Sequence, residues 1–121
     1  MRTTRLPLAA AAAVSLALAA PGGALAAATP LTGTVGPGFT ITLASKAGKK
    51  VTTLKAGSYA ITVRDKASIH DFHLKGPGVN KVITNVPFVG TKSVTVTLKK
   101  GTYTYVCDPH ASAMKGSFKV S

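Results

Sequence analysis

Apolar and polar residues alternate along most of this chain from residue 39 onward. Each alternating run has one apolar face and one face of Thr, Ser or Lys, and the runs lie at 39–43, 59–64, 93–98, 102–107 and 118–120. A period of two predicts half-buried β-strands, and the abundance of Thr, Val, Ile and Tyr suits a pleated sheet. No stretch after residue 26 shows a helical period. The pattern therefore predicts an all-β domain.

The segments between these runs contain Gly, Lys and Asp, which are typical of turns. Residues 75–91 hold three Gly and two Pro, and we predict a long connection there. In total the pattern predicts about seven or eight short strands in one domain at residues 27–121, arranged as a β-sandwich or a small barrel.

The first 26 residues have the layout of a secretory signal peptide. Arg2 and Arg5 precede an alanine-rich apolar run, a Pro-Gly-Gly break follows, and the small residues of Ala24-Leu25-Ala26 suit signal peptidase. We expect cleavage after Ala26, with Ala28 as the alternative. The apolar run is too short for a span of about 20 apolar residues. We therefore expect an exported protein, periplasmic or extracellular, with no stable membrane insertion.

The chain is strongly basic, with 15 Lys and Arg against 3 Asp and Glu and a formal net charge of +12. Signal removal would take away Arg2 and Arg5. A lysine-rich surface keeps a small exported protein soluble, and the alternative is attraction to an acidic protein partner or an anionic envelope surface. Nucleic acid is not an expected partner, because the lysines are scattered and no base-stacking aromatic motif accompanies them.

The candidate metal ligands are concentrated in the stretch CDPHASAM at residues 107–114. Cys107 is the single cysteine of the chain, so it has no partner for an internal disulfide. His110 follows three residues later, and Met114 follows four residues after that. An odd thiol in an oxidising compartment needs pairing, burial or a ligand, and the neighbouring residues make a metal attractive.

Strand parity selects among the upstream histidines. In SIHDFHLKG, His70 shares a face with Phe72 and Leu74, whereas His73 lies on the opposite face. If the two apolar side chains point into the core, His70 points inward. The alternative, His73 as the ligand, requires the opposite parity.

The same rule turns Cys107 inward at its strand end, and Met114 as well if extended structure begins near residue 115. Together with His110 in the turn and His70, these side chains can converge at one end of the sandwich. Two imidazoles, one thiolate and a weak axial thioether suit copper in electron transfer.

The stretch GTYTYVCDPHASAMKGSFKV resembles the copper loop of the cupredoxins, small blue copper proteins that include plastocyanin, amicyanin and pseudoazurin. SIHDFHLKGPG is similar to the strand that bears their first histidine, and the resemblance extends from residue 39 to residue 120. It implies a Greek-key β-sandwich and one type 1 copper per chain. The ligands it implies are His70, Cys107, His110 and axial Met114.

Two features depart from the family pattern. The spacing H-x-x-x-M is one residue shorter than in plastocyanin and one longer than in amicyanin. Asp71 stands where Asn is usual, and the family's contact from this position leads to the residue after the cysteine, here Asp108. Two close carboxylates would repel and raise one pKa. We predict that Asp71 accepts the backbone N–H of Asp108, whose side chain turns to solvent.

The resemblance implies a monomeric carrier of single electrons between redox partner proteins, with His110 as the exit route flanked by Pro109 and Ala111. Lysines around this patch would steer acidic partners. The alternative is a copper storage or delivery module. We expect no enzyme, because a Cys–His hydrolase needs a third orienting group and an oxyanion site, and a multicopper oxidase needs further histidines.

Overall fold

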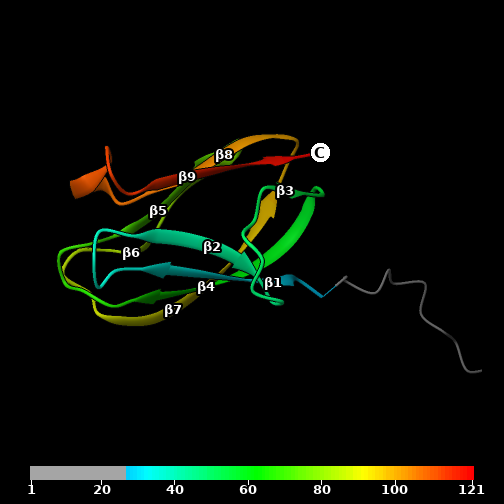
Figure 1. Ribbon diagram of the computed structural model, residues 1–121. Helices are drawn as coiled ribbons and strands as arrows, with labels where there is room; N and C mark the ends of the chain where they lie inside the picture. The colour runs from blue at the N-terminus through cyan, green and yellow to red at the C-terminus, as the bar shows by residue number, and fades with distance from the viewer. Residues whose placement is uncertain (1–26) are drawn as a thin grey trace, which may run out of the picture.

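The structure is a computed structural model that describes residues 27–121 (Figure 1). The predicted signal peptide, residues 1–26, lies outside the described residues. The described part forms nine strands and one short 3₁₀ helix: β1 (Thr29–Val35), β2 (Ile41–Ser45), β3 (Thr53–Leu54), β4 (Gly57–Asp65), β5 (Phe72–Gly76), β6 (Val79–Thr84), β7 (Gly90–Leu98), β8 (Gly101–Val106), η1 (Asp108–His110) and β9 (Lys115–Val120). None of the helical structure in residues 27–121 is long and apolar enough to cross a membrane.

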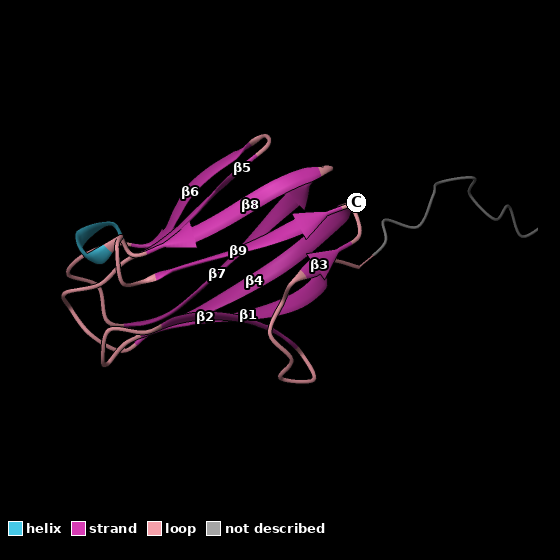
Figure 2. Ribbon diagram, turned by 45° about the horizontal axis from the view of Figure 1, so that its top comes forward, coloured by secondary structure: helices cyan, strands magenta, loops and turns pink. Residues whose placement is uncertain are grey.

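The strands form two sheets that pack face to face, as Figure 2 shows. One sheet has the order β2-β1-β4-β7 and the other the order β3-β9-β8-β5-β6. The chain crosses between the two sheets five times, on leaving β2, β3, β4, β6 and β7. The predicted all-β sandwich is thus confirmed, with nine strands in place of seven or eight.

Alternating side chains from both sheets fill the core between them. Tyr103 and Tyr105 of β8 point inward and are almost fully buried. Tyr103 stacks on Phe118 and Tyr105 on Phe72, with ring centroids 5.5 and 5.7 Å apart. A Cβ at Gly116 would overlap the Tyr105 ring, so glycine is needed in β9 to leave room for that ring. These stacked pairs fix the position of β8 and therefore of the residues at its end.

Two strands, β1 and β6, do not show the apolar–polar alternation in the sequence, and each has a physical reason. In β1 the inward positions are Leu31, Gly33 and Val35, and a Cβ at Gly33 would lie 2.8 Å from Phe72, so glycine interrupts the apolar pattern. The predicted long connection at 75–91 is wrong, because β6 lies inside it and pairs antiparallel with β5. Only the last two residues of β6 are buried, which leaves this edge strand without an apolar face.

Four loops meet at one end of the sandwich, on the left in Figure 2. Val35 of β1 pairs with Asp65 of β4, and Asp65 pairs with Gly90 of β7. The loops at 36–40, 66–71 and 85–89 therefore lie at the same end. The β8–β9 loop with η1 joins them there. We call this end the loop end.

Candidate metal centre

The β8–β9 loop places Cys107, His110 and Met114 through its own backbone hydrogen bonds. The Cys107 N–H donates to Met114 O at 3.0 Å, the His110 N–H to Cys107 O at 3.0 Å, and the Met114 N–H to His110 O at 2.8 Å. Pro109 occupies η1, where its missing N–H leaves no bond unmade. Cys107 and Met114 are buried and His110 is partly exposed. The loop thus closes on itself without help from a ligand.

His70 reaches the same point from the other side, at the end of the β4–β5 loop. It is fully buried, and its Nδ1 lies 3.6 Å from Cys107 Sγ. His110 Nδ1 lies 3.6 Å from the same sulfur and 3.2 Å from His70 Nδ1. The three ligand atoms all lie within 4.8 Å of one another.

The donor set of this cluster fits copper. Two imidazole nitrogens and a sulfur face one point. A proton shared between the nitrogens would give those two atoms a hydrogen bond but would leave the sulfur without a partner. Burial raises the pKa of the Cys107 thiol, so its thiolate requires a nearby cation. Two imidazoles and a thiolate are the in-plane donors that type 1 copper prefers. The residues present would therefore hold the metal that the sequence predicts.

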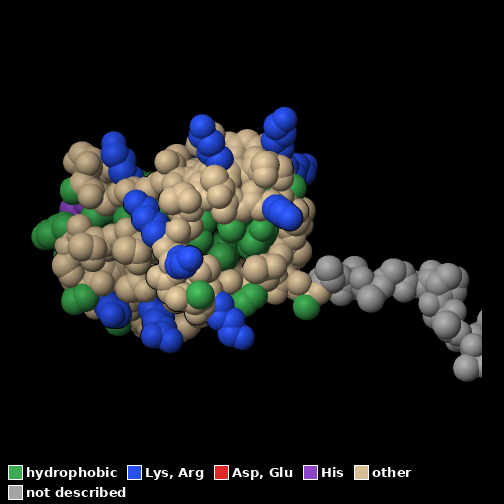
Figure 3. All heavy atoms as spheres, turned by 45° about the vertical axis from the view of Figure 1, so that its right-hand side comes forward, with side chains coloured by type: hydrophobic (Ala, Val, Ile, Leu, Met, Phe, Trp, Pro, Cys, Tyr) green, Lys and Arg blue, Asp and Glu red, His purple; other side chains and the backbone are tan. Residues whose placement is uncertain are grey.

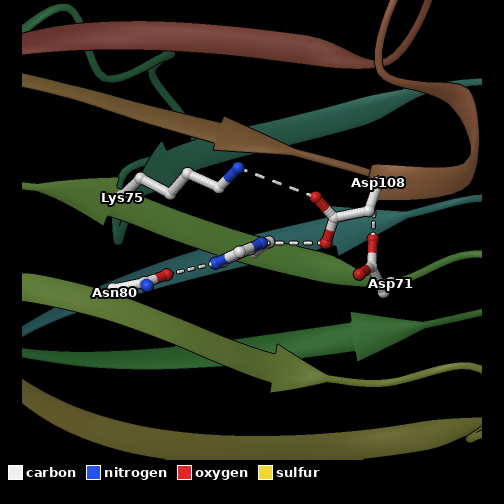
Figure 4. Close-up of polar contacts among 5 residues, drawn as sticks. Asp71, Lys75, Asn80 and Asp108 are labelled. Carbon is white, nitrogen blue, oxygen red and sulfur yellow. Dashed lines mark hydrogen bonds and ion pairs between the residues drawn. The ribbon is translucent and has the colours of Figure 1, made fainter.

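His73 does not join this cluster, which agrees with the parity prediction. It lies in β5 with its ring toward the outer side, where Nδ1 is 2.8 Å from Asp108 Oδ2 and Nε2 contacts Asn80 Oδ1 (Figure 4). Lys75 Nζ lies 3.8 Å from the other carboxylate oxygen of Asp108. This outer network ties the loop after Cys107 to β5 and β6. Sequence reasoning did not detect it, since it depends on the register of three strands.

Asp71 contacts Asp108 as predicted: the backbone N–H of Asp108 donates to Asp71 Oδ1 at 2.6 Å. The side chain of Asp108 is 44% exposed but is not free in solvent, because it contacts His73 and Lys75. Burial, and next the neighbouring Asp108 side chain, raises the pKa of Asp71 from 3.8 to about 6. The pKa of Asp108 is lowered, first by its contact with Asp71.

Phe39 is the site residue that sequence reasoning misplaced. The alternation put it on the inner face of a strand, but it lies in the β1–β2 loop and is 60% exposed. Its ring meets His110 edge-on at 4.8 Å and His70 at 5.7 Å between centroids. In the same loop, Gly36 has φ +73°, and a Cβ there would lie 2.9 Å from His70 Cδ2. The Gly36-Pro37-Gly38 turn before Phe39 is the signal that a strand had not yet begun.

Comparisons with known proteins agree with this geometry. Residues 40–121 match the model of a family described as copper binding proteins, plastocyanin/azurin family. Rusticyanin carrying point substitutions is 26% identical, with 76% of each chain covered and a TM-score of 0.52. Reduced rusticyanin is 25% identical, with 76% of this chain and 78% of that chain covered and a TM-score of 0.51.

A chain of a heme-copper terminal oxidase dimer is similar in fold alone, at 20% identity and a TM-score of 0.53, with 76% of this chain and 63% of that chain covered. No curated protein sequence matches this chain significantly.

Proposed function

Because this chain belongs to the plastocyanin/azurin family of copper-binding proteins, we propose that it carries single electrons between redox partner proteins. The residues that would hold the copper are His70, Cys107, His110 and Met114, with the thioether of Met114 as the weakest donor. The observation that carries the proposal is the convergence of two imidazoles and one thiol at a single point. Copper bound there supplies a one-electron couple between Cu(I) and Cu(II).

The contribution of the protein is a ligand geometry that the β-sandwich sets in advance. Cys107 extends from β8, whose inward tyrosines are locked in the core, and His110 is held by the hydrogen bonds of its loop. His70 is packed against the Gly36 turn. Ligands held on a rigid frame rearrange little when the metal changes its charge, which favours rapid electron transfer.

The proposed exit for electrons is the partly exposed ring of His110. Five large apolar side chains are exposed within residues 27–121, and four of them lie in the loops of the loop end: Phe39, Ile69, Val86 and Val89. Pro109 and Ala111 are exposed beside His110 as well. An apolar end of this kind supports a small, transient interface with a redox partner.

We also propose that the protein works outside the cytoplasm, as the signal-like pattern of residues 1–26 favours, and that it works as a monomer. A carrier is favoured over an enzyme because the one thiol is buried and faces the two histidines of the cluster. The burial of His70, Cys107 and Met114 also disfavours rapid copper exchange, which a storage or delivery module would need.

The test is to add Cu(II) to the metal-free protein and to record the visible spectrum, the electron paramagnetic resonance spectrum and a voltammogram. We expect an intense thiolate-to-copper charge-transfer band and a reversible one-electron wave. Cys107→Ser should abolish the band, whereas Met114→Gln should leave a coloured but altered site. A colourless complex, or full colour without Cys107, would refute the ligand assignment.

The two upstream histidines give a matched pair of variants. His70→Gln should lose the intense band, and His73→Gln should keep it, because only His70 faces the sulfur. Rapid transfer of copper to a chelating acceptor, combined with slow redox cycling, would favour copper delivery over electron carriage.

A further inference from the structure

Two neighbouring hollows lie beside the β8–β9 loop, and both have Lys50 and Lys115 in their walls. The larger hollow, of about 640 Å³, is also lined by Lys75, Val106 and Ala111. The smaller, of about 320 Å³, is bounded by residues 41–44 of β2. We call the two hollows together the lysine groove. It combines three ammonium groups with an apolar floor.

The lysine groove is built on paired strands. Thr104 of β8 pairs with Ser117 of β9 on one side and with Lys75 of β5 on the other. One row nearer the loop, Val106 of β8 pairs with Lys115 of β9. Directly opposite residues share a face, and the tyrosines between these positions point into the core. Lys75 and Lys115 therefore project from the outer face of the five-stranded sheet on a fixed frame.

Few carboxylates are at hand to neutralise these lysines. The whole sequence has three acidic residues, of which Asp65 and Asp71 are buried. Asp108 pairs closely with His73 and lies 3.8 Å from Lys75. Among residues 27–121 the other two lysines of the groove have no acidic partner within ion-pair distance. Figure 3 shows a face on which Lys and Arg side chains surround exposed apolar groups and no acidic side chain is visible.

We propose that the lysine groove binds an acidic segment of the redox partner, with carboxylates on Lys50, Lys75 and Lys115 and small apolar side chains against the floor. This inference rests on the proposed function as an electron carrier. Ala111, in the wall of the groove, directly follows His110 in the loop. A segment held there places the body of the partner over the loop end, so the groove orients the complex while the apolar end makes the contact for electron transfer.

The test uses copper-loaded protein in its diamagnetic Cu(I) form, with ¹⁵N labelling for NMR. An octaglutamate peptide is titrated at low ionic strength, and octaglutamine is the uncharged control. We expect amide shifts in β8, β9 and the β2–β3 segment, and binding that weakens steeply with added salt. The double variant Lys50→Gln/Lys115→Gln should weaken binding by about three- to tenfold.

The matched control is Lys81→Gln/Lys99→Gln, which removes the same charge from another lysine-lined hollow. It should weaken peptide binding by less than about twofold, a loss expected from net charge alone. Equal weakening by both double variants, or shifts away from the groove, would overturn the proposal. So would tighter, Lys50- and Lys115-dependent binding to vesicles of anionic phospholipid, because the groove would then recognise a membrane.

The same samples separate this inference from the proposed function. The visible charge-transfer band and the reversible redox wave are recorded before each titration. Peptide binding without these signals leaves the groove in place and refutes electron carriage, whereas normal signals without groove-specific binding refute the groove alone.

Discussion

Asp71→Asn should stabilise the metal-free protein at neutral and alkaline pH. The native carboxyl is 7% exposed, and its pKa is raised from 3.8 to about 6, first by burial and next by the Asp108 side chain. Between about pH 4 and pH 6 the folded protein therefore binds more protons than the unfolded chain, so stability falls as the pH rises through that window. Above it, the ionised carboxylate costs about 2–3 kcal/mol of unfolding free energy.

Asparagine removes that cost and keeps an oxygen to accept the Asp108 N–H. Urea unfolding of the metal-free protein should show that Asp71→Asn gains about 2 kcal/mol more at pH 8 than at pH 4. Because the sequence has only three acidic side chains, carboxyl ¹³C NMR can follow the native Asp71 directly, and it should titrate near pH 6. An equal gain in stability at both pH values would show that burial and the neighbouring carboxylate do not raise the pKa of Asp71.

Three further substitutions test other parts of the structure. Phe39→Ala should leave the urea midpoint nearly unchanged, because the ring is 60% exposed. It should slow electron exchange with a partner protein by about tenfold in stopped-flow mixing. An unchanged rate would show that Phe39 does not contact the partner. Tyr103→Phe should lower the free energy of unfolding by about 1–3 kcal/mol, measured in urea, because the buried hydroxyl both donates and accepts a hydrogen bond. An unchanged free energy would mean that other groups replace these two bonds. Gly116→Ala should cost about 1–3 kcal/mol, since the new Cβ overlaps Tyr105, and a neutral result would show that the ring can move aside.

The sequence predicted the meeting of His70, Cys107 and His110 better than it predicted the strands around them. The spacing of Cys107, His110 and Met114 in the sequence sets their relative positions in the fold, because all three belong to one hairpin turn whose geometry is local. His70 was chosen by parity, and it is buried although it precedes β5 rather than lying in it. Parity still worked because Phe72, two residues later, is anchored in the core and sets the direction of the chain before it.

The features that were missed depend on contacts between distant segments. The contact of His73 with Asp108 joins residues 35 positions apart, and only the register of β5 against β8 brings them together. Phe39 alternates like a strand residue, yet the turn before it places the ring outside the sheet. A periodic pattern reports which face a strand buries, and it does not report where the strand begins.

The metal centre is therefore organised from two directions by bonds that exist without the metal. Backbone bonds close the β8–β9 loop, and from outside the loop Asp71 accepts the N–H of the residue next to Cys107. A carboxylate in place of the family's asparagine makes this second restraint dependent on charge: its burial is costly until a cation lies nearby. Copper at His70, Cys107 and His110 would supply such a cation, so metal binding should relieve the strain that Asp71→Asn removes by substitution. The stabilisation gained from that substitution should accordingly be smaller in the copper-loaded protein than in the metal-free protein.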